Sequence, residues 1–592
     1  MRKKIKILAI AATIFVAFAC DEDKFLDQQN PNAITPEIFW KTADDFQAAL
    51  VTVYGATQFH SISGSGLTFE MLLADMNATN WWHGHFAYNN HTYSNNDNEV
   101  TQKWADLYVG VFRANQILDK LETESVPDLS SDERAQIEGQ VRFLRAFFFF
   151  TLAHTYGGAV IHTTVPSGSN EFTKPFSSIE EVTNTVILPD LEIAVESLPE
   201  VWTANQDIGR ATWGAAKTLQ GKTFLFVQDY AAARDAFKEV IDAGVYSLVP
   251  NILDNFTTED EFNSESIFEV SYSETLVPGE GGGLVDSNPG NISVAAAIGA
   301  EATTIVSAMA TQAKGGFHVV QPTYYAHELF IFDEPDLNLN MNIQAIDVEE
   351  EDTTFFTQSR RMHASIVDQN SDGLYYLLPA ADADAYNGGQ SAYTKKWSNW
   401  YDRAGEVSPY KSGINFRHIR YADVLLMYAE AILEADGDVS TAIDYIDRVR
   451  ARAGVVTLQA YLAANNNTFP EFHKPILASI GATRSFTAPT VEAVRTHLRM
   501  VERPLELYAE GHRFKDLVRW GIAEDIFNQR FSEEEDRANN PAIIAEHEAR
   551  LDINVPREDF VIKSVNYASN PAQFSYYPIP SQEVQTNPAL GN

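Results

Sequence analysis

Helices that come in pairs constrain the fold of this chain more than any other feature of its 592 residues. Apolar and aromatic side chains recur at helical spacing from Val100 to Leu121, and they do so again from Arg134 to Tyr156. Gly157 follows the second run directly, in the position where glycine ends a helix. The two segments are therefore expected to form a helical hairpin.

Two further pairs have the same form. The second pair covers residues 211–227 and 230–243, and the third covers 421–435 and 440–453, with Ser440 as the expected N-cap. Short hairpins with small residues at the helix crossing and aromatic residues on the seam are typical of tetratricopeptide-like repeats. The pattern predicts a mostly α-helical, tetratricopeptide-like scaffold. Because the pairs are scattered and not tandem, it also predicts long loop-rich insertions.

The longest insertion separates the second and third pairs. Residues 251–409 show little helical periodicity and are rich in Gly, Asn, Asp and Tyr, which predicts loops with minor β structure. Loops held on a rigid frame commonly carry binding surfaces. We therefore predict one domain over residues 20–592, with helical repeats at about 36–250 and 410–530 and a loop-rich, ligand-side insert between them.

The N-terminus has the form of an export signal. Basic residues precede an apolar stretch that is shorter than the roughly 20 residues needed to span a bilayer, which predicts a signal peptide at residues 1–19. Cys20 follows directly and is the only cysteine, so no intramolecular disulfide is possible. Its position resembles the lipobox of bacterial lipoproteins and predicts lipidation of Cys20. The alternative is an ordinary signal peptide that ends beside a cysteine by chance.

Charge and motifs exclude several classes of function. The chain carries 81 acidic and 43 basic residues, a net charge of -38, which disfavours nucleic acid as a partner. Neither a phosphate-binding P-loop nor a G-x-S-x-G nucleophile motif is present in the sequence. No residue pattern requires a cofactor, so none is predicted.

The best ligand-binding candidates lie in one polar segment before the first helical pair. It has no helical period and combines Trp81, Trp82 and Tyr88 with Asn77 and Asn80. A pyranose ring has an apolar C–H face that stacks on aromatic side chains, and its hydroxyl groups hydrogen-bond with amides. Two adjacent tryptophans in a polar loop cannot easily both be buried. At least one is therefore expected to stack on a ligand.

Further aromatic candidates follow in the insert. Tyr324 and Tyr325 come after an Ala-rich stretch and Phe317, and Trp397 and Trp400 lie beside basic residues. Core packing explains each of these residues about as well as ligand binding does. Since a curved oligosaccharide needs an arc of aromatic side chains from separate loops, the two tyrosines and the two tryptophans are counted as candidate ligand-binding residues.

Closely spaced acids near the C-terminus raise the alternative of a glycosidase. These acids are Glu502, Glu506 and Glu510. A glycosidase needs two carboxyl groups across an open cleft, roughly 5–9.5 Å apart, and the sequence shows no such placement. We interpret the acids as partners of basic residues, with Glu510–Arg513 and Asp516–Arg519 expected as i,i+3 pairs on a helix. No catalytic residue is predicted.

Two patterns resemble metal sites without completing one. His83, His85 and His91 share the tryptophan segment, but no spaced cysteine or carboxylate joins them. The run that begins at Asp368 resembles the start of a calcium loop, but Pro379 stands where the bidentate glutamate belongs. No metal ligand is predicted.

Several sequence blocks stand in a characteristic order along the chain. They are FLDQQNPNAITPEIFW from Phe25, VRFLRAFFFFTLAHTYGG from Val141, RYADVLLMYAEAILEADG from Arg420, RVRARAG from Arg448, and YYPIPSQEVQTNPALGN from Tyr576. Together these blocks resemble the SusD/RagB family of outer-membrane lipoproteins, from Cys20 to Asn592. Pro504 departs from the helix-friendly residue that is usual in the family.

The resemblance implies a helical fold that binds oligosaccharides without catalysis and sits as a lid on a SusC-type TonB-dependent transporter. It also implies a lipid anchor at Cys20 in the outer membrane, with the protein exposed at the cell surface. Some members of the family handle peptides, so peptide cargo stays the alternative, ahead of a surface glycosidase. A protein that passes its ligand on must release it. We expect micromolar to millimolar dissociation constants, or about -8 to -4 kcal/mol.

Overall fold

The structure is a computed structural model, and it describes most of the chain. The described residues are 39–80, 83–273, 305–309, 316–347, 352–383, 392–400, 412–474, 481–543, 545, 567 and 570–590. The predicted signal peptide, Cys20, Trp81 and Trp82 lie outside them. Of the helices in the described part of the chain, none has both the length and the apolar character needed to cross a bilayer.

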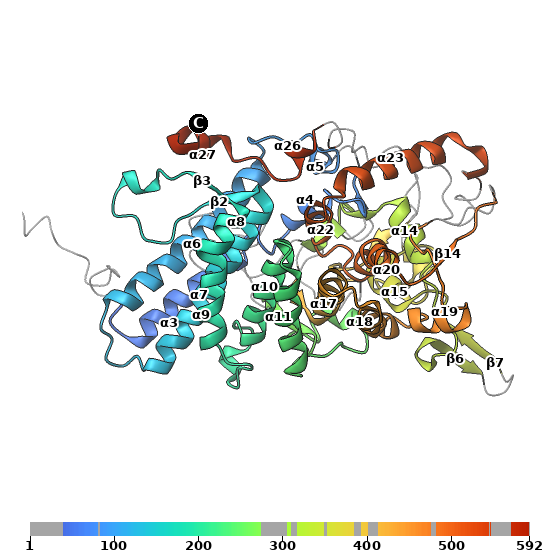
Figure 1. Cartoon of the computed structure of the whole chain (residues 1–592), viewed down its shortest axis with the longest axis horizontal. Helices are drawn as coiled ribbons and strands as arrows, with labels where there is room; N and C mark the ends of the chain where they lie inside the picture. The colour runs from blue at the N-terminus through green and yellow to red at the C-terminus, as the bar shows by residue number, and fades with distance from the viewer. Residues whose placement is uncertain are drawn as a thin grey trace, which may run out of the picture.

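The scaffold is a row of helices, each packed against the next (Figure 1). These are α3 (Ala43–Thr57), α6 (Asn98–Thr123), α7 (Ser131–Tyr156), α9 (Leu188–Ser197), α10 (Trp213–Phe226) and α11 (Tyr230–Asp242). In chain order, α3 packs against α6, α6 against α7, α7 against α9, α9 against α10 and α10 against α11. The prediction of a mostly α-helical protein built from hairpins is therefore confirmed.

The third predicted pair continues this row in space. It consists of α17 (Tyr421–Ala435) and α18 (Val439–Arg452). Although a long insertion separates them in the sequence, α11 packs directly against α17, which packs against α18. The insertion therefore leaves the row of helices and returns to it without separating neighbouring hairpins.

Local signals place most helix ends within a few residues of the prediction. Gly157 follows α7 with φ +79°, the left-handed conformation that glycine adopts without strain. The expected N-cap of α18 is wrong, because the helix begins earlier. Asp438, not Ser440, is the N-cap, and its carboxylate accepts a hydrogen bond from the backbone N–H of Thr441 at 3.1 Å.

The other described α-helices lie around the row. They are α4 (Leu67–Met71), α5 (Phe86–Asn89), α8 (Ile179–Val182), α13 (Ile305–Met309), α14 (Tyr324–Ile331), α15 (Arg360–Ser365), α16 (Ala380–Ala383), α19 (Leu458–Ala464), α20 (Val491–His497), α21 (Arg503–Glu506), α22 (Arg513–Arg519), α23 (Ala523–Asn539), α26 (Pro571–Phe574) and α27 (Ser581–Thr586). Figure 1 shows α27 beside α6, at the far end of the molecule from α14 and α15.

The described strands form antiparallel pairs. The pairs that position the insert are β4 (Ser266–Val270) with β12 (Phe416–Arg420), β1 (Asn77–Ala78) with β5 (Gln321–Pro322), and β8 (Ile366–Val367) with β11 (Tyr393–Thr394). The others are β2 (Gly158–Val160) with β3 (Phe176–Ser178), β6 (Ile343–Asp347) with β7 (Asp352–Phe355), β9 (Leu374–Tyr375) with β10 (Leu378–Pro379), and β13 (Phe469–Pro470) with β14 (Phe486–Thr487). The chain leaves the scaffold after β4 and returns in β12, so this pair closes the base of the insert.

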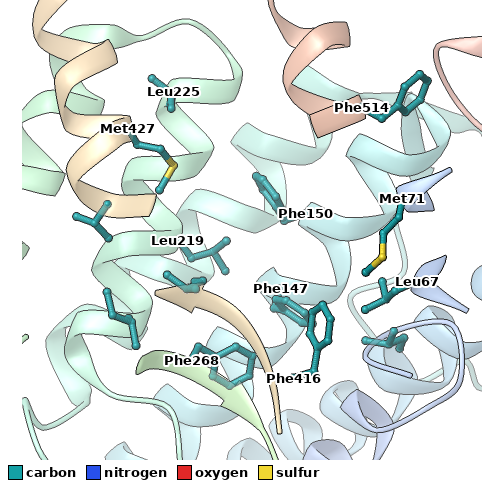
Figure 2. Close-up of a cluster of buried hydrophobic side chains, with 14 of the residues drawn as sticks. Leu67, Met71, Phe147, Phe150, Leu219, Leu225, Phe268, Phe416, Met427 and Phe514 are labelled. Atoms are coloured by element: carbon teal, nitrogen blue, oxygen red, sulfur yellow. The ribbon is translucent and has the colours of Figure 1, made fainter. Parts of the chain in front are cut away.

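A buried apolar cluster joins the scaffold to the base of the insert (Figure 2). Phe147 of α7 meets Phe268 of β4 edge to face, with ring centroids 5.5 Å apart. Leu219 of α10, Phe416 of β12 and Met427 of α17 lie in the same cluster. Because burying each large apolar side chain contributes roughly 1.5–3 kcal/mol, the cluster holds the helical row and the β4–β12 pair together.

Close contact between α6 and α7 depends on a glycine. A methyl group at Gly110 would lie 2.5 Å from a ring carbon of buried Phe148. We therefore expect Gly110→Ala to lower the free energy of unfolding by about 1–2 kcal/mol, since forcing the packed helices apart outweighs the gain of about 1 kcal/mol in helix propensity. Urea denaturation measures the change.

Gly168→Ala is the control, because nothing lies within 4 Å of the position that its methyl group would take. Equal stability of the Gly110→Ala variant and the unmodified protein would contradict the close-packing argument.

Candidate ligand-binding site

Three segments that are distant in the sequence meet at Tyr508. The side-chain amide of Asn77 in β1 donates a hydrogen bond to the Tyr508 hydroxyl at 2.8 Å, and the hydroxyl of Thr394 in β11 lies 2.9 Å from the same oxygen. In addition, β1 pairs with β5, with Asn77 opposite Pro322. The tryptophan segment, the insert and the loop after α21 are therefore held together by buried hydrogen bonds.

A group of aromatic and histidine rings lies beside this junction. The rings of His83 and His318 are 6.1 Å apart, and those of His318 and Tyr393 are also 6.1 Å apart. His318 and Tyr393 are buried, whereas Phe317, next to His318, is 50% exposed. We call the group formed by His83, Phe317, His318 and Tyr393 the loop surface, and Phe317 is its exposed ring. It presents an aromatic ring where the tryptophan segment and the insert meet.

The predicted tryptophans flank this surface in sequence. Trp81 and Trp82 lie outside the described residues, but the residues on either side of them are joined, because the backbone N–H of His83 donates to the carbonyl of Asn80 at 3.0 Å. Asn80 is fully buried, and neither atom of its side-chain amide has a hydrogen-bond partner among the described residues. A buried amide without a partner is uncommon in folded proteins, and this one adjoins the loop surface.

Most other predicted contact residues are enclosed by protein. Trp397 is 0% exposed; its indole N–H donates to the carbonyl of Ala509 at 2.8 Å, and its ring stacks on Phe416. Tyr324 is buried as well, and Trp400 is partly buried. Trp397 and Tyr324 therefore present no open face to a ligand, because the segments that carry them pack against other parts of the protein.

Tyr88 and Tyr325 are also enclosed by protein. Tyr88 stacks on Tyr93 with ring centroids 5.0 Å apart. The guanidinium of Arg530 lies over the ring of Tyr325, 3.2 Å from its centroid. Asn77 is buried and bonded to Tyr508. Of the residues expected to contact a ligand, Asn77 and Asn80 are buried beside the loop surface, and Tyr88 and Tyr325 are packed in the core.

The histidines of the tryptophan segment do not converge. His85 stacks on Phe69 with ring centroids 3.9 Å apart, and His91 is packed against Phe527 at 5.2 Å. Burial lowers the pKa of His85 and of His91 to about 3. Across the described ranges, no group of three or more His, Cys, Asp or Glu side chains is placed to hold a metal ion.

The C-terminal acids belong to a buried ion-pair network. The guanidinium of Arg420 donates to Glu265 at 2.7 Å, to Glu506 at 2.6 Å and to Glu510 at 2.8 Å. Glu502 is bound by Arg361 at 2.7 Å. All of these carboxylates are buried, so none faces an open cleft with a second acid as a glycosidase requires.

One expected pair in this region is wrong. Asp516 and Arg519 do form an i,i+3 pair at 2.8 Å, but Glu510 pairs with Arg420 and Arg513 pairs with Asp75 at 2.7 Å. The reason is a break in the helix. Because α21 ends before Glu510 and α22 begins at Arg513, the two residues do not share a helix face.

A hollow on the scaffold escaped the sequence reasoning. It has a volume of about 540 Å³ and lies between α6, the loop after β2 and α27. We call it the α6 groove, and its lining includes Trp104, Tyr108, Phe112, His162, Phe172 and Glu583. The sequence contains one signal for it, since Trp104 and Tyr108, which line the groove, are spaced four residues apart and share one face of α6.

The fold and the loop surface define the class of protein. A row of helical hairpins holds an insert whose loops, pinned by buried hydrogen bonds, present the exposed ring of Phe317, and the buried acids are engaged in ion pairs. This is the arrangement of a binding protein on a helical-repeat frame.

The chain belongs to the SusD family. The profile of the SusD family matches residues 264–592, and a profile described as starch-binding associating with outer membrane matches residues 24–225. The resemblance seen in the sequence blocks is therefore confirmed. A SusD-like protein of Formosa agariphila is 25% identical over 88% of this chain and 90% of its own length.

Solved structures share the fold. A SusD superfamily protein from Bacteroides vulgatus is similar with a TM-score of 0.69 and 25% identity, covering 93% of this chain and 98% of its own. Surface glycan-binding protein A from Bacteroides thetaiotaomicron, solved in complex with laminarihexaose, is similar with a TM-score of 0.60 and 18% identity, covering 92% of this chain and 97% of its own.

The Arg420 network yields a stability prediction. Arg420→Ala leaves buried Glu265, Glu506 and Glu510 without a shared counter-charge, so we expect the free energy of unfolding to fall by about 3–5 kcal/mol. Urea denaturation followed by circular dichroism measures it. Arg420→Lys keeps the positive charge but forms fewer hydrogen bonds. Its free energy of unfolding is therefore expected to lie between those of the unmodified protein and the Arg420→Ala variant.

Arg234→Ala is the matched control, because Arg234 pairs with Asp436 where both side chains are partly exposed. Loss of that pair is expected to cost about 1 kcal/mol or less. Equal losses of unfolding free energy in Arg420→Ala and Arg234→Ala would show that burial of the network does not add to its contribution to stability.

Acid is expected to weaken the fold through the same carboxylates. Burial alone would raise the pKa of Glu510, but Arg420 and Lys396 outweigh it and lower the pKa from 4.5 to about 2. A carboxyl group with a lowered folded pKa stabilises the protein above its unfolded pKa, and this contribution disappears as pH falls from 4.5 through about 2. The midpoint urea concentration of unfolding, measured between pH 6 and pH 2, should decrease as the pH is lowered through that window. Glu510→Gln should reduce the fall, and an unchanged slope would contradict the assignment.

Proposed function

We propose that this protein is a cell-surface glycan-binding lipoprotein that captures oligosaccharides and passes them to a SusC-type TonB-dependent transporter. Membership of the SusD family supports glycan binding, as does the similar fold of a surface glycan-binding protein solved with laminarihexaose. The description of one matching profile as associating with the outer membrane supports the location. Cys20 would carry the lipid anchor, and two or more acyl chains would make attachment stable.

The loop surface is the proposed capture site, and exposed Phe317 beside the tryptophan segment is the observation that carries it. Phe317 adjoins His318, whose ring lies against those of His83 and Tyr393. The tryptophans that follow Asn80 would add stacking faces. Such aromatic faces match the apolar C–H face that a pyranose ring presents.

The buried acids near the C-terminus support binding without catalysis. Glu502, Glu506 and Glu510 are buried and bonded to arginine, so they cannot protonate a glycosidic oxygen in an open cleft. A binding protein that releases its ligand to a transporter needs only modest affinity. We therefore propose that the protein leaves its ligand chemically unchanged.

Substitutions on the loop surface test the proposal. Phe317→Ala, and separately a Trp81→Ala, Trp82→Ala double variant, should weaken oligosaccharide binding about tenfold or more through lost stacking. Affinity electrophoresis with a polysaccharide panel, followed by calorimetry, measures this, and assay for released reducing ends should detect no hydrolysis.

Phe486→Ala is the matched control, because Phe486 is a similarly exposed phenylalanine on β14 and does not belong to the loop surface. If no polysaccharide binds, the proposed function fails. If both loop-surface variants bind as well as the unmodified protein does, the capture site lies elsewhere.

A further inference from the structure

We infer that the α6 groove is a second carbohydrate site, which takes a short neutral oligosaccharide. The choice of ligand class rests on the proposed function, whereas the site itself rests on the geometry of the groove. Its volume of about 540 Å³ falls within the roughly 300–1,000 Å³ that is typical of small-molecule sites.

One wall of the groove is a continuous aromatic row. The rings of Trp104 and Tyr108 on α6 are 4.9 Å apart, those of Tyr108 and His162 are 6.0 Å apart, and those of His162 and Phe172 are 6.2 Å apart. Phe112 on α6 is 41% exposed and Phe172 is 54% exposed. Exposed rings along a groove provide stacking faces for the apolar side of a sugar.

The opposite wall is polar. It is formed by α27, where Gln582, Glu583 and Thr586 line the groove. Gln582 is exposed and Glu583 is partly exposed, so an amide and a carboxylate face the aromatic row across the hollow. A ligand with one apolar face and a rim of hydroxyl groups fits between two such walls, because it can stack on one and hydrogen-bond with the other.

The charge of the lining selects against acidic ligands. Among the described residues that line the groove, Glu583 is the only Asp, Glu, Lys or Arg. Burial, together with nearby Lys174, lowers the pKa of His162, so its ring is neutral at physiological pH. A uronate or sulfate group would therefore meet a carboxylate in the lining, on a chain whose net charge is -38, while the Lys174 ammonium lies outside the lining and donates to the carbonyl of Ile161 at 3.1 Å.

The two walls are fixed to each other before any ligand binds. The backbone N–H of Ser581 donates to the carbonyl of Asn95 at 3.0 Å, and the Asn587 side-chain amide donates to the carbonyl of Lys174 at 2.9 Å. Just before α27, Tyr577 donates from its N–H to the carbonyl of Thr155 at 2.7 Å. Little conformational freedom is lost on binding to a site that is already formed.

The groove lining and the loop surface share no residue, and in Figure 1 the helices α27 and α6 lie at one end of the molecule, whereas α14 of the insert lies toward the other. A long neutral glycan could occupy both sites and gain affinity from their linkage. A short oligosaccharide would occupy each site independently.

The test compares binding isotherms of laminarihexaose, maltohexaose and xylohexaose with those of an acidic galacturonate hexamer. The groove variant is Phe112→Ala, Phe172→Ala, and both rings are exposed enough that the fold should be retained. Phe486→Ala is the control, and Phe317→Ala reports on the loop surface. Calorimetry should show two classes of site for at least one neutral hexasaccharide, with one class weakened about tenfold or more in the groove variant only.

Each contrary result has a distinct meaning. Isotherms unchanged in the groove variant, with binding lost in Phe317→Ala, would overturn the second site and leave the proposed function standing. Equal binding of the acidic hexamer at the groove would overturn its neutral specificity. A dimer in sedimentation that the groove variant disrupts would show that a second copy covers the groove, which also overturns the inference. Absence of binding to every glycan would remove the proposed function together with the inference.

Discussion

The buried guanidinium of Arg420 holds together the parts of this molecule on which the rest depends. It lies at the end of β12, where the insert returns to the scaffold, and binds Glu265 before β4 and two acids near α21. Removing charges from water is costly, and this cost is offset only when all partners are in place. The network therefore sets the relative positions of three chain segments. Tyr508 lies between two of its acids, Glu506 and Glu510, so the junction beneath the loop surface is positioned by the same charges.

The two candidate binding surfaces are built by different means. The loop surface is assembled from segments far apart in the sequence and depends on buried hydrogen bonds to Tyr508. The α6 groove instead uses side chains of one long helix, closed by a C-terminal segment tied to the scaffold. Under the proposed function, shallow stacking on exposed rings would give modest affinity in both places, which suits capture and later release of a glycan.

Local patterns predicted the helices well because a helix depends on neighbouring residues. The helical pairs α6–α7 and α17–α18 form as expected. Each pair ends shortly before a glycine, Gly157 or Gly454, that adopts a positive φ. Prediction failed where local structure breaks. The expected Glu510–Arg513 pair assumed a continuous helix, but Ala509 has φ +55° between α21 and α22. Glu510 therefore points toward Arg420, a partner distant in the sequence.

By itself, the sequence determined the helical hairpins, the family and the segments from which a binding surface could be made, because periodicity, capping residues and ordered motif blocks are local properties. Only the tertiary structure decided which aromatic side chains are open to solvent. Trp397 is fully enclosed and Phe317 is half exposed, although both are aromatic residues in loop-rich sequence. Burial depends on which distant segments cover a side chain, and here those segments are held in place by long-range ion pairs and hydrogen bonds that spacing along the chain does not reveal.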